Sequence, residues 1–184
     1  MRKVFKIILA IFTVLIIAFV VFAAIIFLDV AAYTATGSQT LTPSGAAMGT
    51  ALVAYDPGLS GTAKNVAVEV ANDLQSQGYA VTLAGIKSSA AAHTANYSII
   101  VVGGPVYAGA ATGSVKDFVD NLNLPSGTRL GVFGCGQGAP EGNDIEQLTD
   151  SINPPAGTVV VKIGQPENLI ERAQDFVAQL TAPE

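Results

Sequence analysis

The sequence has little cysteine, little histidine and few basic residues, and each shortage excludes a class of protein. Its 184 residues include one cysteine, Cys135, and one histidine, His93. A single cysteine excludes both an intrachain disulfide and a metal site built from a cysteine cluster. The lysines and arginines do not cluster and are not interleaved with aromatic residues, so nothing supports nucleic-acid binding. We therefore expect neither nucleic acid nor metal as a partner.

The longest stretch without a charge, a proline or a glycine covers residues 7–28. As a helix rising ~1.5 Å per residue it spans roughly 33 Å, enough to cross a bilayer core of about 30 Å. A helix that is apolar on every face does not suit the core of a small domain. It is also longer than the apolar region of a cleaved signal peptide. We predict a retained membrane anchor over residues 1–30 that contacts the lipid bilayer through residues 7–28.

The distribution of charge around this stretch predicts its orientation. Arg2, Lys3 and Lys6 come just before it, whereas the next basic residue is Lys64. This bias places the N-terminus in the cytoplasm and the rest of the chain outside it. Residues 30–184 hold six basic and thirteen acidic residues, a net charge of −7. Such a surface suits either solubility or docking to a basic partner.

The remainder of the chain divides into a linker and one domain. Residues 31–48 are small, polar and uncharged, which is typical of a flexible stalk. From residue 49 to residue 184, short apolar runs alternate with amphipathic stretches, which predicts strands alternating with helices. The expected strands are residues 50–55, 79–83, 98–103, 129–134 and 158–163.

Helical spacing of apolar residues predicts helices near residues 63–77, 113–122 and 144–152, and a last one from Pro166. Residues 84–96 form a short, weakly helical connection. Five strands separated by helical segments predict an α/β fold with a parallel sheet covered on both faces. The strand order could be 2-1-3-4-5 or a truncated Rossmann order, and either one places a ligand site at the carboxyl ends of the strands.

Three glycine-rich loops follow those carboxyl ends, at residues 56–62, 104–113 and 134–143. Glycine lets the backbone approach a ligand, although tight turns also require it. The first loop opens onto a helix N-terminus, which favours a phosphate, and Ser60 and Thr62 add hydroxyl groups. Simple N-capping is the alternative role for these two. The loop has neither the GxxxxGK[ST] nor the GxGxxG pattern, which excludes a P-loop and disfavours a dinucleotide.

The loops resemble those of flavodoxins. Residues 58–63 are similar to the family's phosphate loop, [Ser/Thr]-x-[Ser/Thr]-Gly-x-Thr, with Ser60 and Gly61 matching and with Gly58 and Ala63 replacing hydroxyl residues. Residues 103–109, with sequence GGPVYAG, are similar to the Gly-[Thr/Ser]-Pro-x-Tyr segment beside the flavin ring. Residues 134–138 lie where the family closes on the other face of the ring.

This resemblance covers about residues 50–180 and implies a flavodoxin-like, doubly wound sheet of order 2-1-3-4-5. It also implies non-covalent flavin mononucleotide (FMN) and electron transfer with an unidentified redox protein, without catalytic residues of the chain's own. Tyr107 would stack on the flavin, or else simply pack half-buried. The implied cofactor-binding residues are Gly58, Leu59, Ser60, Gly61, Thr62, Ala63, Pro105, Val106, Tyr107, Ala108, Gly109, Gly134, Cys135, Gly136 and Gln137.

Other interpretations stay open. Cys135 and His93 could form a nucleophile pair, but Phe133 and Gln137 stand where an elbow of the form G-x-C-x-G needs glycine. Asp56 is expected to form a turn with Pro57 rather than to approach a phosphate. A cofactor-free interaction module is an alternative, favoured by the two missing hydroxyls. An FMN-dependent oxidoreductase at the membrane is another.

Overall fold

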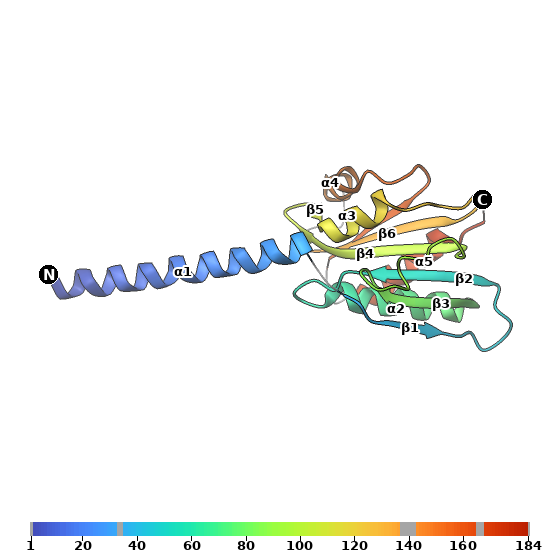
Figure 1. Ribbon diagram of the computed structural model, residues 1–184, viewed down its shortest axis with the longest axis horizontal. Coiled ribbons are helices and arrows are strands. Elements are labelled where there is room, and N and C mark those ends of the chain that lie inside the picture. The colour runs from blue at the N-terminus through green and yellow to red at the C-terminus, as the bar shows by residue number, and fades with distance from the viewer. Residues whose placement is uncertain (1, 33–34, 137–142, 165–167, 184) are drawn as a thin grey trace.

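A computed structural model describes residues 2–32, 35–136, 143–164 and 168–183, in which one long helix precedes an α/β domain (Figure 1). The helix α1 (Arg2–Ala32) extends away from the domain. Its stretch Val4–Leu28 has a mean hydropathy of 3.3, and none of it is buried. By length and composition this stretch is sufficient to cross a membrane.

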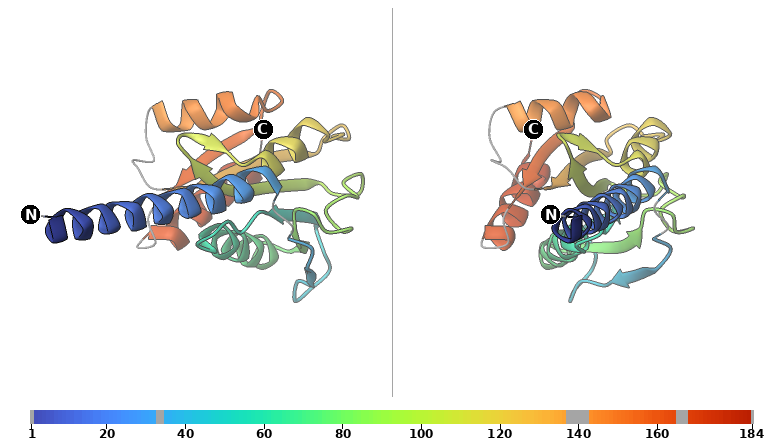
Figure 2. Two further views of the ribbon diagram at one scale, coloured as in Figure 1. Left: turned by 60° about the vertical axis from the view of Figure 1, so that its left-hand side comes forward. Right: turned by 90° about the vertical axis from the view of Figure 1, so that its left-hand side faces the viewer.

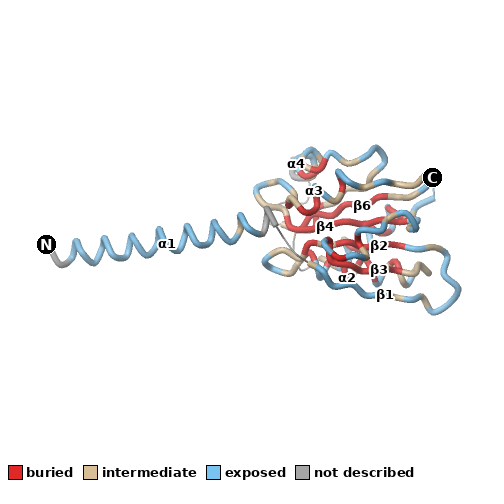
Figure 3. Tube along the Cα trace, in the orientation of Figure 1, coloured by how far each residue is buried: buried red, intermediate tan, exposed pale blue. Residues whose placement is uncertain are grey.

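Five parallel strands form the centre of the domain. They are β2 (Gly49–Tyr55), β3 (Tyr79–Gly85), β4 (Ile99–Tyr107), β6 (Arg129–Cys135) and β7 (Val159–Ile163). Their order in the sheet is β3-β2-β4-β6-β7, which confirms the predicted 2-1-3-4-5 order and excludes the truncated Rossmann order. The middle strands β2, β4 and β6 are largely buried (Figure 3), because helices cover them on both faces.

Helices lie on both faces of the sheet (Figure 2). The helices α2 (Thr62–Ser76) and α5 (Leu169–Thr181) pack on one face, over a core that includes Val66, Leu74 and Phe176. The helices α3 (Gly113–Asp120) and α4 (Asn143–Ile152) cover the other face, where Leu148 contributes to the core. The predicted amphipathic helices are therefore confirmed, with most of their apolar residues toward the sheet. Ile170 of α5 was expected to be buried but is 57% exposed, and the predicted helix start at Pro166 lies outside the described residues.

Two short strands join the five that we predicted. β1 (Ser38–Leu41) pairs antiparallel with β3, and Ser38 lies opposite Ala84. Part of the segment 31–48, predicted as a flexible stalk, is therefore an edge strand of the sheet, because β3 offers it a free row of backbone groups. β5 (Ala110–Ala111) folds back on the end of β4 as a hairpin.

The connection 84–96 contains turns and no helix, unlike our prediction. Ser88 N–H donates to the Gly85 carbonyl at 2.8 Å, and Ser88 Oγ accepts a hydrogen bond from Ala91 N–H at 3.2 Å. These local bonds from a serine offer the backbone an alternative to the hydrogen bonds of a helix.

Candidate functional site

The carboxyl ends of β2, β4 and β6 bring the three glycine-rich loops into contact. A Cβ atom placed on Gly58 would lie 2.7 Å from Pro105 Cγ, so the first loop presses against the second. A Cβ atom on Gly136 would lie 2.9 Å from the Val106 carbonyl oxygen, so the third loop presses against the second from the other side. Glycine is needed at both positions because the loops approach this closely.

Asp56 joins the first two loops through its carboxylate, which is completely buried. Its Oδ1 accepts a hydrogen bond from Gly58 N–H at 3.0 Å, as expected of the turn former that we predicted. Its Oδ2 accepts hydrogen bonds from the hydroxyls of Thr112, at 2.9 Å, and Ser114. Three donors to one carboxylate satisfy a buried charge that would otherwise be costly.

The start of α2 has the features that we sought for a phosphate. Gly61 is the N-cap residue and has a φ of 71°, and a Cβ atom placed on it would meet nothing within 4 Å. Ser60 Oγ donates to Thr62 Oγ1 at 3.0 Å and accepts from Thr62 N–H at 3.3 Å. The N–H groups of Ala63 and Lys64, in the first turn, have no partner within the helix. This corner therefore offers hydrogen-bond donors beside open space.

Two of the candidate residues point into the core instead of toward the loops. Ala63 and Cys135 are 1% and 5% exposed and belong to the same apolar cluster, so they can offer a ligand only their backbone. Burial raises the pKa of the Cys135 thiol from 9.0 to about 12, which keeps it protonated. His93 is exposed, and its Nδ1 lies 2.8 Å from the Ser89 carbonyl. These positions argue against a cysteine nucleophile.

The second loop is a tight hairpin at the edge of the site. Tyr107 ends β4, is half-buried and lies opposite Ala110. The turn between them consists of Ala108 and Gly109, whose φ angles are 51° and 84°. Ala111 N–H donates to Ser151 Oγ at 3.1 Å and so holds the hairpin against α4. Gln137, the last of the candidates, lies outside the described residues.

Sequence reasoning missed two features of this edge. It did not predict that Thr112 and Ser114 share the Asp56 carboxylate, since the three residues meet only after folding. It also missed Lys162, which is 3% exposed and lies beside Gly134 in the sheet. The signal for Lys162 was a lysine inside the apolar run Val159–Ile163.

Among the described residues, no group of three or more His, Cys, Asp or Glu could hold a metal ion.

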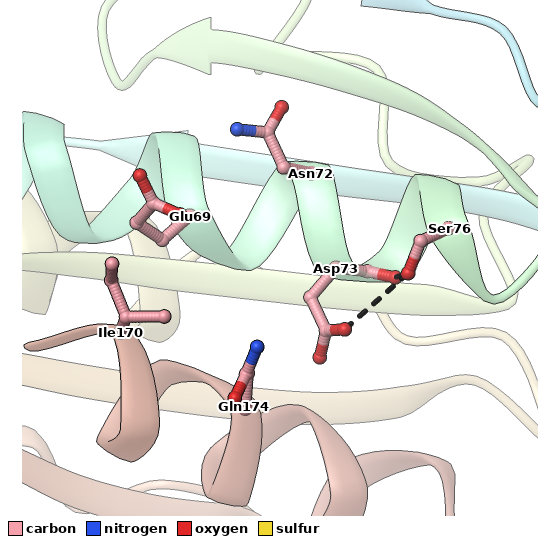
Figure 4. A pocket seen from close by; sticks show the side chains of 6 residues that line it. All are labelled: Glu69, Asn72, Asp73, Ser76, Ile170 and Gln174. Carbon is pink, nitrogen blue, oxygen red and sulfur yellow. Dashed lines mark hydrogen bonds between the residues drawn. The ribbon is translucent and has the colours of Figure 1, made fainter.

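The cavities described in the domain lie away from the three loops. One, of about 200 Å³, is a groove between α2 and α5 (Figure 4). It is smaller than the ~300–1,000 Å³ of usual small-molecule sites. Another, of about 560 Å³, lies at the opposite edge of the sheet, beside the C-terminal end of α2. The groove in Figure 4 is lined by Glu69, Asn72, Asp73, Ser76, Ile170 and Gln174.

Solved structures with the same architecture include flavodoxins. A short-chain flavodoxin associated with a non-canonical PDU bacterial microcompartment is 26% identical, with a TM-score of 0.55 over 72% of this chain and 97% of that one. A WrbA-like flavodoxin from Agrobacterium tumefaciens is 17% identical, with a TM-score of 0.52 over 72% and 94%. These two structures show that the chain has the flavodoxin-like fold. No family model and no curated protein sequence matches the chain.

Proposed function

We propose that this protein is a membrane-anchored, flavodoxin-like electron carrier that binds FMN non-covalently at the three loops. The observation that carries the proposal is the start of α2, where Gly61 faces open space at a helix N-terminus, next to the hydroxyls of Ser60 and Thr62. The fold similarity to flavodoxins supports it. FMN would supply the redox chemistry, and the chain would supply binding and orientation.

The phosphate would take hydrogen bonds from the first-turn N–H groups of α2 and from the two hydroxyls. Each such bond to a charged group contributes ~1.5–3 kcal/mol. The structure explains the two hydroxyls that are missing relative to flavodoxins, because Gly58 has no room for a side chain beside Pro105 and Ala63 is in the core. We therefore expect FMN affinity to be lower than in flavodoxins, by roughly 100-fold or more.

The flavin ring would lie beside the hairpin, with Tyr107, Ala108 and Gly109 against one of its faces. The third loop, which contacts Val106 at Gly134 and Gly136, would close on the other face, as the resemblance to flavodoxins implies. An aromatic face against the flavin would disfavour its reduced, anionic form and so lower its potential.

The anchor and its orientation belong to the same proposal. The uncharged stretch of α1 over residues 7–28 would span the bilayer, with Arg2, Lys3 and Lys6 on the cytoplasmic side. Protease added to intact spheroplasts should then remove the domain. Protection that is lost only when the membrane is lysed would show the opposite orientation.

A cofactor-free interaction module is the second candidate. It is favoured by the hydroxyls of Ser60 and Thr62, which already bond to each other, and by the absence of hydroxyls at Gly58 and Ala63. In this alternative the Asp56 contacts would simply stabilise the loops.

Titration of the full-length protein in detergent with FMN, followed by flavin fluorescence, separates these candidates. Saturable quenching is expected, and its absence at ~100 μM FMN would favour the cofactor-free module. Gly61→Asp and Gly61→Asn are a matched pair, because both residues tolerate the left-handed backbone and only the aspartate repels a phosphate. Gly61→Asp should weaken FMN binding much more than Gly61→Asn does. Riboflavin, which has no phosphate, should bind both variants equally.

A further inference from the structure

The chain that links α1 to the domain is attached at the edge of the sheet that carries the three loops. The Ala35 carbonyl accepts a hydrogen bond from Lys87 N–H at 2.9 Å, and the Gly37 carbonyl accepts one from Gly85 N–H at 2.7 Å. Gly85 is the last residue of β3, so these bonds lie at the carboxyl end of a parallel strand. The helix α1 also contacts α3, which begins at this edge.

The link is too short for the domain to stand far from a membrane. Three peptide units separate Ala32, the end of α1, from Ala35, and they reach at most ~10 Å. The four helical residues that follow Leu28 add ~6 Å along the axis. Ala35 therefore lies within roughly 16 Å of the end of the apolar stretch, and the headgroup layer itself occupies about 5–8 Å of that distance.

Two of the three loops at this edge carry no charge beyond the buried Asp56, whereas the third contains Glu141. Residues 57–63 and 103–115 contain no charged residue. The loop between β2 and α2 protrudes on the side of the domain from which α1 extends (Figure 1). Leu59, in this loop, is 52% exposed. Lys64, in the first turn of α2, and Lys87, in the turn that follows β3, are exposed near this edge. An apolar side chain with lysines near it suits the boundary between acyl chains and anionic headgroups.

We propose that the carboxyl edge of the sheet docks on the lipid surface of the bilayer that α1 spans, with Leu59 at the contact. This inference rests on the proposed anchoring by α1, but not on FMN binding. It implies that whatever exchanges electrons at the three loops reaches them from the same membrane rather than from bulk solution.

Fluorophores attached to single cysteines in the full-length protein, reconstituted in vesicles, test this orientation. Leu59→Cys reports on the carboxyl edge, Ser126→Cys reports on the exposed turn before β6 at the opposite edge, and Thr13→Cys reports on the span. The unsubstituted protein is the blank, because Cys135 is buried. Lipids with a nitroxide at the headgroup should quench the label at position 59 about twofold or more compared with the label at 126.

Each outcome separates the docking from the anchoring. Quenching at position 13 by acyl-chain nitroxides, together with quenching at 59 but not at 126, supports the proposal. Quenching at 13 with equal signals at 59 and 126 overturns the docking and leaves the anchor intact. No quenching at 13 shows that α1 is not inserted, which overturns both. Flavin absorbance of the same vesicles reports FMN binding independently.

Discussion

Thr112 Oγ1 donates a 2.9 Å hydrogen bond to Asp56 Oδ2, which joins the end of β2 to the start of α3 across 56 residues of sequence. Ser114 donates to the same oxygen, and Gly58 N–H donates to the other. All the contacts come from the protein itself. The first two loops are therefore held together before any ligand binds.

The first prediction concerns this carboxylate. Asp56→Ala leaves the Gly58 N–H without an acceptor and leaves the buried hydroxyls of Thr112 and Ser114, 3.0 Å apart, only each other as partners, so we expect it to lower the free energy of unfolding by about 2 kcal/mol. Urea unfolding followed by circular dichroism measures the change. Asp150→Ala, at an exposed position, is the control and should change stability by less than ~0.5 kcal/mol. Equal midpoints for the two variants would show that the Asp56 contacts do not stabilise the fold.

The second prediction concerns the hairpin turn. Ala108 has a φ of 51°, a conformation that costs an alanine about 1 kcal/mol. Asparagine followed by glycine is favoured in such two-residue turns, so Ala108→Asn should raise stability by ~0.5–1 kcal/mol. Asn153 has a φ of 47°, and Asn153→Ala should lower stability by a similar amount. Thermal midpoints that do not move in opposite directions for this pair would contradict the prediction.

The third prediction concerns the thiol. With the pKa of Cys135 at about 12 instead of 9.0, the thiolate fraction at pH 8 is roughly 1,000-fold lower than for an ordinary cysteine. Modification by a thiol reagent should be slow in the folded protein and should accelerate as pH rises. The same protein unfolded in urea is the control, because its cysteine is solvated. Equally fast modification in both states would show that Cys135 is accessible.

The fourth prediction concerns the domain boundary. We propose that residues 35–184 fold without α1. A chain that begins at residue 47 lacks β1, whose Leu41 packs against the core, and also lacks the 2.7 Å bond from Gln75 Nε2 to the Thr42 carbonyl. The longer chain should be more stable by about 2 kcal/mol, although both should unfold cooperatively in urea. Equal stability would restore the stalk interpretation for residues 38–41.

The fold could be predicted from sequence because its signals are local. The apolar run that became β4 and the helical spacing of Val66, Val70 and Leu74 each indicate one kind of element within a few residues. β1 gives no such signal, since Ser38–Leu41 is short and mostly polar. It is a strand only because the edge of β3 is available to it, and β3 begins much further along the chain, at Tyr79.

The candidate site could be predicted only in outline. The positions of the three loops follow from the strand order. Gly58, Gly61, Gly109 and Gly136 therefore lie at the carboxyl edge of the sheet, as the sequence predicts. The directions of individual side chains depend on helix phase and on packing. Ala63 and Cys135 therefore point into the core, although they lie within the expected segments. The Asp56 contacts with Thr112 and Ser114 join distant segments, and no local pattern announces them.

The helix α1 precedes every strand of the domain, so it is synthesised before any of them. If it inserts as its basic residues indicate, the domain must be exported as an unfolded chain and must fold on the far side. A cofactor held without a covalent bond would not travel with that chain. Loading would then depend on free FMN outside the cytoplasm, and the supply there, rather than synthesis of the polypeptide, would set how much of the protein is active.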